Sequence, residues 1–149
     1  MEETLELPAG YRLTVERESS LEDRRALSDA LGAFNEPFLP QADPHSLAVL
    51  VRNSAGELHA GLDGSTYAGW LFIRYLWVHA ELRRSGIGRR LMAEAERQAC
   101  ELGCHSAWVD TFTFQAPEFY AKLGYREFGR LDYPPAHQRI FLQNQLVQP

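Results

Sequence analysis

Arg83-Arg84-Ser85-Gly86-Ile87-Gly88 is the stretch that decides the fold of this 149-residue chain. The run before it, residues 69–78, is nearly all apolar and rich in aromatic and β-branched side chains, which is typical of a strand covered on both faces. The residues after it carry an apolar stripe at helical spacing, made of Leu91, Met92, Ala95, Ala99 and Leu102. A buried strand, a glycine turn and an amphipathic helix therefore follow one another.

This order favours an anion site at the turn. Glycines let backbone N–H groups approach an anion, and the first turn of a helix offers unpaired donors and a favourable dipole. Side-chain charge is added by Arg83, Arg84, Arg89 and Arg90. A pyrophosphate with a nearby ribose phosphate would satisfy such a site. The alternative is a solvated helix start with glycines in a tight turn, but four cations there oppose the dipole unless an anion offsets them.

Elements on either side complete a mixed sheet. The patterns predict a strand at 11–15, a helix from Ser19 or Ser20 to about Phe34, a hairpin of 47–52 and 57–62, a strand at 105–112, a short helix from Pro117 towards Gly124, and strands near 125–131 and 138–142. The crossover from 69 to 112 implies a parallel strand pair, whereas the hairpins imply antiparallel pairs. We therefore expect one α/β domain over residues 1–149.

Composition narrows the function classes. The net charge of -5 argues against a nucleic-acid binder, and no apolar run reaches the roughly 20 residues that cross a bilayer. Together with the acidic start at Met1-Glu2-Glu3, this predicts a cytoplasmic protein that binds no membrane. We expect Cys100 and Cys104 to be two small buried or half-buried residues without a disulfide. The helix is expected to end between them at Gly103.

Two motifs resemble those of a known family. Residues 76–79 with 82–91 resemble the acetyl-CoA-binding motif of the GNAT superfamily of N-acetyltransferases, and residues 118–125 look like its second conserved block. The resemblance covers nearly the whole chain and implies a mostly antiparallel mixed sheet with a central splayed parallel pair, flanked by helices. The chain departs from the family mainly at Arg84, where many relatives have glycine. We expect this to matter little, because the donors come from the backbone.

The resemblance assigns roles to named residues. Backbone groups of Trp77 and Val78 would bind the pantetheine like an added strand, with the Val78 N–H at the thioester oxygen. Tyr120 would protonate the departing thiolate, although it could also be an aromatic of the core. The phosphates would lie on the loop residues Arg83, Arg84, Ser85, Gly86, Ile87, Gly88 and Arg89. No general base stands out, since Asp110, His79 and Glu81 all suit positioning, capping or solvent exposure.

The acceptor pocket is expected near residues 35–38 and 133–137, with Glu36 and Asp110 as candidate substrate-binding residues. The resulting prediction is an enzyme that moves acetyl from acetyl-CoA to a primary amine of a small molecule or peptide, without a metal. A non-catalytic acyl-CoA-binding or sensor module with the same fold is the alternative, and a nucleic-acid patch at the arginines ranks last. Dimers are common for such folds, and a homodimer through the C-terminal strands is compatible with the sequence.

Overall fold

The computed structural model describes residues 6–147 and divides the chain into two compact units, one up to Pro40 and one from Gln41 onward. The elements in chain order are α1 (Leu21–Asn35), β1 (His45–Arg52), β2 (Leu58–Tyr67), β3 (Trp70–Val78), the 3-10 turn η1 (Ala80–Leu82), α2 (Ile87–Glu101), β4 (Ser106–Phe112), α3 (Pro117–Lys122), β5 (Arg126–Tyr133) and β6 (His137–Gln145). Each unit is described by itself.

The first unit contains one helix and no strand among its described residues. Helix α1 begins as predicted, because the hydroxyl of Ser20 accepts a hydrogen bond of 3.0 Å from the Asp23 N–H. The predicted strand at 11–15 is wrong. A strand needs a neighbour to take up its backbone hydrogen bonds, and residues 11–15 pair with none. The N–H of Tyr11 instead closes a local turn on the carbonyl of Pro8.

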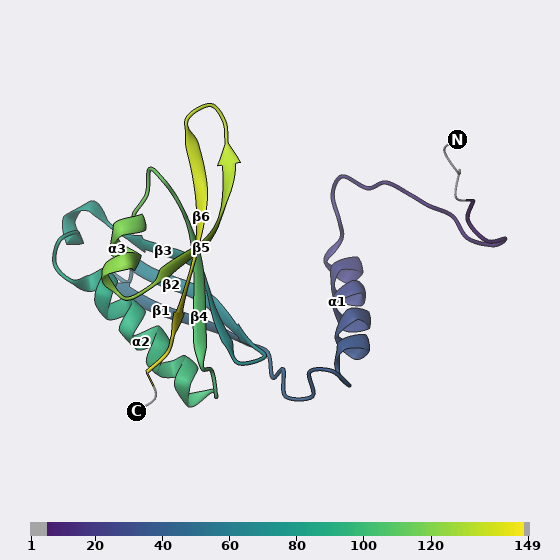
Figure 1. Cartoon of the computed structure of the whole chain (residues 1–149), viewed down its shortest axis with the longest axis horizontal. Helices are drawn as coiled ribbons and strands as arrows, with labels where there is room; N and C mark the ends of the chain where they lie inside the picture. Colours follow the sequence, from purple (N-terminus) through teal and green to yellow (C-terminus); the bar gives the residue numbers. More distant parts are fainter. Residues whose placement is uncertain (1–5, 148–149) are drawn as a thin grey trace. The chain divides into compact units, whose positions relative to one another are not determined.

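The second unit is a six-stranded sheet with the order β1-β2-β3-β4-β6-β5. Strands β3 and β4 run parallel, while every other neighbouring pair is antiparallel, so the predicted mixed sheet is confirmed. Helices α2 and α3 lie on one face of this sheet (Figure 1). The hairpin β1–β2 and the final pair β5–β6 are both found where the sequence placed them, each with longer strands than expected.

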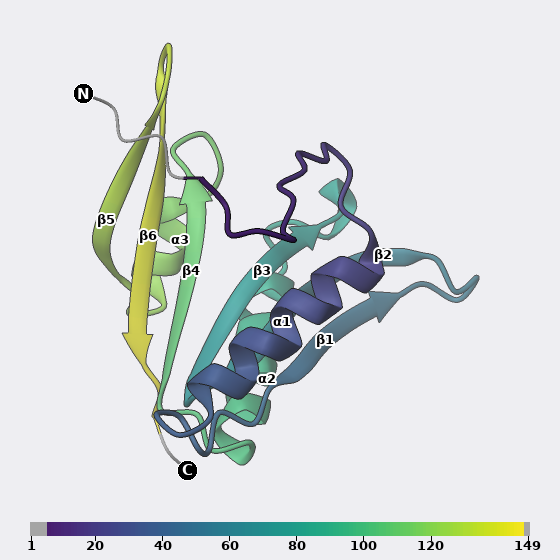
Figure 2. The same cartoon turned by 90° about the vertical axis from the view of Figure 1, so that its right-hand side faces the viewer.

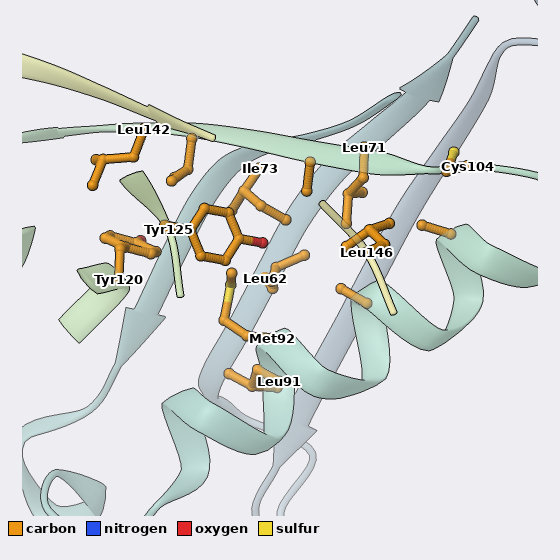
Figure 3. Close-up of a cluster of buried hydrophobic side chains, with 14 of the residues drawn as sticks. Leu62, Leu71, Ile73, Leu91, Met92, Cys104, Tyr120, Tyr125, Leu142 and Leu146 are labelled. Atoms are coloured by element: carbon orange, nitrogen blue, oxygen red, sulfur yellow. The ribbon is translucent and has the colours of Figure 1, made fainter. Parts of the chain in front are cut away.

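The core fills the space between the sheet and α2. Leu91, Met92, Ala95 and Ala99 of the predicted stripe are buried against Leu62, Leu71 and Ile73 of the sheet (Figure 3). Leu102 is instead 39% exposed, because α2 ends at Glu101 and the chain leaves the helical face there. Gly103 then turns the chain with φ 87°, as expected, and Cys104 enters the core. No disulfide joins the two cysteines in the described part of the chain.

A bulge divides β3 into two halves. Asp63 of β2 pairs with Tyr75 and Gly64 pairs with Ile73, so Arg74 is an extra residue in β3. The parallel ladder to β4 also stops at the Ile73–Val109 pair. Beyond that point the two strands diverge toward their C-terminal ends (Figure 2). A bulge bends and twists its strand, which explains why the divergence starts here.

The expectation that residues 69–78 are covered on both faces is met only in part, because Trp70 and Phe72, on the face opposite Leu71 and Ile73, are half-buried. Leu71 and Ile73 are buried, whereas Tyr75 is 68% exposed and Trp77 46% exposed. The second half has lost β4 as a neighbour, so one backbone edge is uncovered, while Leu76 and Val78 still pack against the core. Among residues 6–147, the helices include none with the length and apolar character needed to span a bilayer.

Candidate active site

A cleft of about 1360 Å³ opens between the diverging ends of β3 and β4. Its walls come from three further segments: the loop before α2, the first turn of α2, and the β4–α3 connection with α3. The predicted cofactor-binding residues on its lining are Trp77, Val78, Arg83, Arg84, Gly86, Ile87, Gly88 and Arg89. Tyr120 and Asp110 line it as well. The structure therefore brings these sequence-predicted positions together around one space.

The first turn of α2 presents free donors to this cleft. Gly86 holds φ 82° and no side chain caps the helix, while the first intrahelical bond runs from the Arg90 N–H to the Gly86 carbonyl. The N–H groups of Ile87, Gly88 and Arg89 thus have no carbonyl one turn back. Combined with the helix dipole, uncapped donors at the lining of a cleft fit an anionic group such as a pyrophosphate.

Close packing also requires a glycine at position 88. A Cβ at this position would lie 3.3 Å from the Phe119 ring and 3.9 Å from Val78. The missing side chain lets the start of α2 approach α3 and the end of β3. This glycine therefore sets the distance between three walls of the cleft.

Arg84 is the residue with an unfavourable backbone. Its φ is 62°, in the left-handed region, which costs about 1–2 kcal/mol for a residue with a Cβ. The exchange of glycine for arginine was expected to matter little, since backbone donors do not depend on the side chain. The structure adds a conformational cost that this expectation did not include.

The arginines and the serine of the loop have different roles. Arg83 donates from Nε to the Val78 carbonyl at 3.2 Å, so its side chain ties the loop to the end of β3. The Ser85 hydroxyl donates to the Leu82 carbonyl and is not part of the cleft lining. Arg90 also lies outside the lining, whereas Arg84 and Arg89 are part of it.

Tyr120 is at the boundary between core and cleft. Its side chain is 6% exposed and makes edge contacts with Phe119 and Tyr125, at ring distances of 5.1 and 6.1 Å. Figure 3 shows it at one end of the core, beside Leu142. Burial, followed by the charge of Asp110, raises the pKa of Tyr120 to about 12. Its hydroxyl forms no hydrogen bond within residues 6–147, so a protonated donor borders the cleft.

Asp110 is engaged by a residue that the sequence reasoning missed. Its carboxylate, 16% exposed, accepts a hydrogen bond of 2.8 Å from Nε of Arg139 on β6. Arg139 also donates to the Tyr133 hydroxyl at 3.4 Å, and these hydrogen bonds raise the pKa of Arg139 above its usual value. The guanidinium occupies one oxygen of this carboxylate and fixes its orientation. The pairing favours the positioning role for Asp110 over that of general base.

His79 and Glu81 belong to the turn that follows β3. Nδ1 of His79 accepts from the Glu81 N–H at 3.1 Å, which caps η1. His59, His79 and Glu81 bring potential metal-ligand atoms within 4.8 Å of one another. The two imidazoles are stacked, with ring centroids 4.8 Å apart and 17° between their planes. That the protein uses no metal stays a prediction.

Aromatic side chains gather at the end of β4 and the start of β6. Phe112, Phe114, Tyr133 and His137 contact one another in a cluster that includes the predicted acceptor segment 133–137. The two phenylalanines had no signal in the sequence beyond alternation with threonines. Glu36, the other predicted acceptor residue, follows α1 in the first unit, and its role stays a prediction.

The sequence profile of the family described as acetyltransferase (GNAT) domain matches residues 44–127. The chain is also 40% identical over 126 residues to blasticidin-S acetyltransferase of Streptomyces morookaense, a match that covers 83% of this chain and 91% of the relative. The chain belongs to the GNAT acetyltransferase family. It is an acyltransferase enzyme, and the family resemblance of its two motifs is confirmed.

Solved structures support the same assignment for this acetyltransferase. An acetyltransferase of Agrobacterium tumefaciens superposes with a TM-score of 0.83 at 28% identity, over 91% of this chain and 99% of the other. A structure from Bacillus anthracis, described as a streptothricin acetyltransferase in complex with acetyl coenzyme A, gives a TM-score of 0.60 over 69% of this chain and 64% of the other. Its identity of 18% makes this second likeness one of fold.

Proposed function

We propose that this acetyltransferase moves the acetyl group of acetyl-CoA directly to a primary amine of a small molecule or peptide, with Tyr120 as the proton donor. One observation carries the proposal. The Tyr120 hydroxyl, protonated and without a hydrogen bond in the described residues, borders the same cleft as the uncapped start of α2 and the unpaired edge of β3.

The cleft residues fit the three parts of acetyl-CoA. The N–H groups of Ile87, Gly88 and Arg89 would hold the pyrophosphate, with Arg83, Arg84 and Arg89 supplying charge. The edge of β3 beyond Ile73 would hydrogen-bond the pantetheine arm through the backbone of Trp77 and Val78. Acetyl-CoA itself supplies the acetyl group as a thioester, which an amine can attack without a covalent enzyme intermediate.

The chain's own groups then have two tasks. The Val78 N–H would stabilise the negative charge that develops on the acetyl oxygen as the amine nitrogen bonds to the carbonyl carbon. Tyr120 would donate its phenol proton to the sulfur as the carbon–sulfur bond breaks, while the proton lost by the amine leaves to water. A pKa near 12 keeps Tyr120 protonated at neutral pH, and burial in the same cleft also raises the proton affinity of the thiolate.

The first acceptor to test is blasticidin S, because a relative named for its acetylation is 40% identical to this chain. The relationship extends over nearly the whole of that relative, so its acceptor is the best single starting point. Polyamines, aminoglycosides, amino acids and peptides with free N-termini complete an informative panel. We further propose that the enzyme is cytoplasmic and uses neither a metal nor a nucleic acid.

The test follows free thiol released from acetyl-CoA with each amine, for the natural enzyme and for Tyr120→Phe. We expect the substitution to lower kcat by about 10²-fold or more, in line with general acid catalysis, while binding of CoA measured by thermal stabilisation stays the same. Tyr125→Phe is the matched control. It also removes a buried hydroxyl, one bonded to Glu96 at 2.9 Å, but Tyr125 is not part of the cleft lining.

Two outcomes would contradict the proposal. Full turnover by Tyr120→Phe at saturating acetyl-CoA would exclude the acid role. Stabilisation by CoA without thiol release, for every amine in the panel, would identify a binding or sensor module. Substitution of Asp110, His79 or Glu81 is expected to lower activity less than loss of the Tyr120 hydroxyl, and a larger loss at one of them would reverse this order.

A further inference from the structure

An aromatic platform lies at the end of β4, where Phe114 lines the cleft. It consists of Phe112, Phe114, Tyr133 and His137. The rings of Phe112 and Phe114 are stacked, with centroids 5.3 Å apart and planes at 14°. Tyr133 meets Phe112 edge-on at 4.9 Å, and His137 meets Phe114 edge-on at 4.8 Å. Each phenylalanine is thus fixed by a second ring.

Phe114 is the member of the platform that faces the cleft. It is part of the cleft lining, and 62% of its surface is exposed although one face lies on Phe112. Leaving a large apolar ring in water forgoes the stabilisation that burial would give. A ring in this state, on the wall of a binding cleft, has a free surface on which another flat group can stack.

The loop that carries Phe114 is held in place by hydrogen bonds to β6 and within itself. The Thr113 N–H donates to the Gln138 carbonyl at 3.0 Å, and the Gln138 N–H donates to the Thr113 hydroxyl at 3.2 Å. On the other side, the Gln115 side chain accepts from the Phe112 N–H at 2.8 Å. Because the loop is already ordered, stacking on Phe114 costs little additional conformational entropy.

The charges around the platform favour a neutral flat ring over a cation. The Arg139 guanidinium already lies 6.0 Å from the centre of the Phe112 ring. The nearby carboxylate of Asp110 is occupied by the same guanidinium. A second cation on the platform would be repelled by Arg139, and the Asp110 carboxylate is already paired with that guanidinium. A neutral planar ring is not repelled by Arg139 and does not need a carboxylate as its partner.

We infer that the platform is an acceptor subsite for amines that carry a flat unsaturated ring, which stacks on Phe114 while the amine points into the cleft. The inference rests on the proposed function and adds its substrate class. It places the selectivity of the enzyme on a side chain outside the acetyl-CoA residues. Ring stacking of this kind corresponds to a preference of about 2- to 12-fold over a non-planar ring of similar size.

The experiment compares 2-phenylethylamine with 2-cyclohexylethylamine, which share the amine and chain and differ in the planarity of the ring. The preference is measured as the ratio of kcat/KM values, or of inhibition constants against whichever panel amine the enzyme accepts. We expect the natural enzyme to prefer the flat ring, Phe114→Ala to abolish the preference, and Phe114→Trp to keep it. The KM for acetyl-CoA should be unchanged in both variants.

Phe128→Ala is the matched control, because Phe128 is a half-exposed phenylalanine on β5 that packs against Phe141 and lies outside the cleft lining. It should leave the preference intact. Equal constants for the two amines in the natural enzyme, or an unchanged preference in Phe114→Ala, would overturn the inference. Failure of the proposed function has a different signature, namely no thiol release with any amine of the panel. Thermal melting of each variant separates loss of stacking from loss of folding.

Discussion

Arg84→Gly is expected to make the protein more stable, although it removes a charged side chain from the cofactor loop. Arg84 has φ 62°, a backbone state that costs a residue with a Cβ about 1–2 kcal/mol and costs glycine almost nothing. Glycine gains more freedom in the unfolded chain, which offsets about 0.4–1 kcal/mol of that benefit. The net increase in the free energy of unfolding is about 0.8 kcal/mol.

The measurement is urea unfolding at neutral pH, supported by thermal melting. For a chain of this length, about 0.8 kcal/mol raises Tm by roughly 2–3 °C. Arg84→Ala is the decisive control, because alanine removes the same charge and keeps the Cβ. It should show no such gain. The side chain of Arg84 is exposed and forms no hydrogen bond or ion pair within residues 6–147, so its removal alone should change stability little.

The affinity for CoA should fall in both Arg84 variants, although Arg84→Gly is expected to be more stable. Both variants lose one cation from the cleft lining, so both should bind CoA a few-fold more weakly, and more so at low salt. The reasoning is refuted if Arg84→Gly is no more stable than Arg84→Ala. In that event the left-handed backbone at this position carries no strain, and the arginine is conformationally equivalent to the glycine of the relatives.

Two further predictions follow from the bulge and from the buried tyrosine. Gly64→Ala should lower the free energy of unfolding by about 3 kcal/mol or more, because the new Cβ would lie 2.3 Å from the Phe72 carbonyl oxygen across the β2–β3 ladder. Gly129→Ala is the control, since no atom lies within 4 Å of the Cβ added there. Equal melting temperatures of the two variants would contradict this explanation. The folded state raises the pKa of Tyr120 from 10 to about 12, so its contribution to stability is complete below pH 10 and is lost as the pH rises towards 12. Urea unfolding across this range should show a smaller alkaline loss for Tyr120→Phe than for the natural protein, and identical slopes would show that burial does not hold the proton.

The sequence predicted the parts of the fold whose signal is local. The cap at Ser20, the stripe of α2, the turn at Gly103 and the proline that starts α3 each depend on a few neighbouring residues. The strand at 11–15 failed for the opposite reason. Alternation of apolar residues shows that a segment could have a buried face, whereas a strand exists only if a partner edge is present.

The sequence could predict the parts of the candidate site that belong to a local motif. It could not predict the contacts that depend on how strands pair across the sheet. Six of the positions 83–89 lie on the cleft lining and Ser85 does not, and their binding of the cofactor stays a prediction. They could be placed there because a glycine turn between a strand and a helix is a local pattern. The Arg139–Asp110 pair could not, since it joins residues 29 apart through the β4–β6 register. Phe112 and Phe114 were likewise invisible, because their exposure and mutual stacking follow from the path of the loop after β4.

The extra residue at Arg74 has a consequence for how such an enzyme can change over time. The opening between β3 and β4 originates in a step of the main-chain ladder, not in the sizes of the side chains around it. Residues on the walls can therefore be exchanged without closing the gap, provided that Gly64 keeps the neighbouring ladder intact. The same backbone can in this way serve enzymes with different acceptors, because the residues that bind the cofactor are separate from those that select the amine.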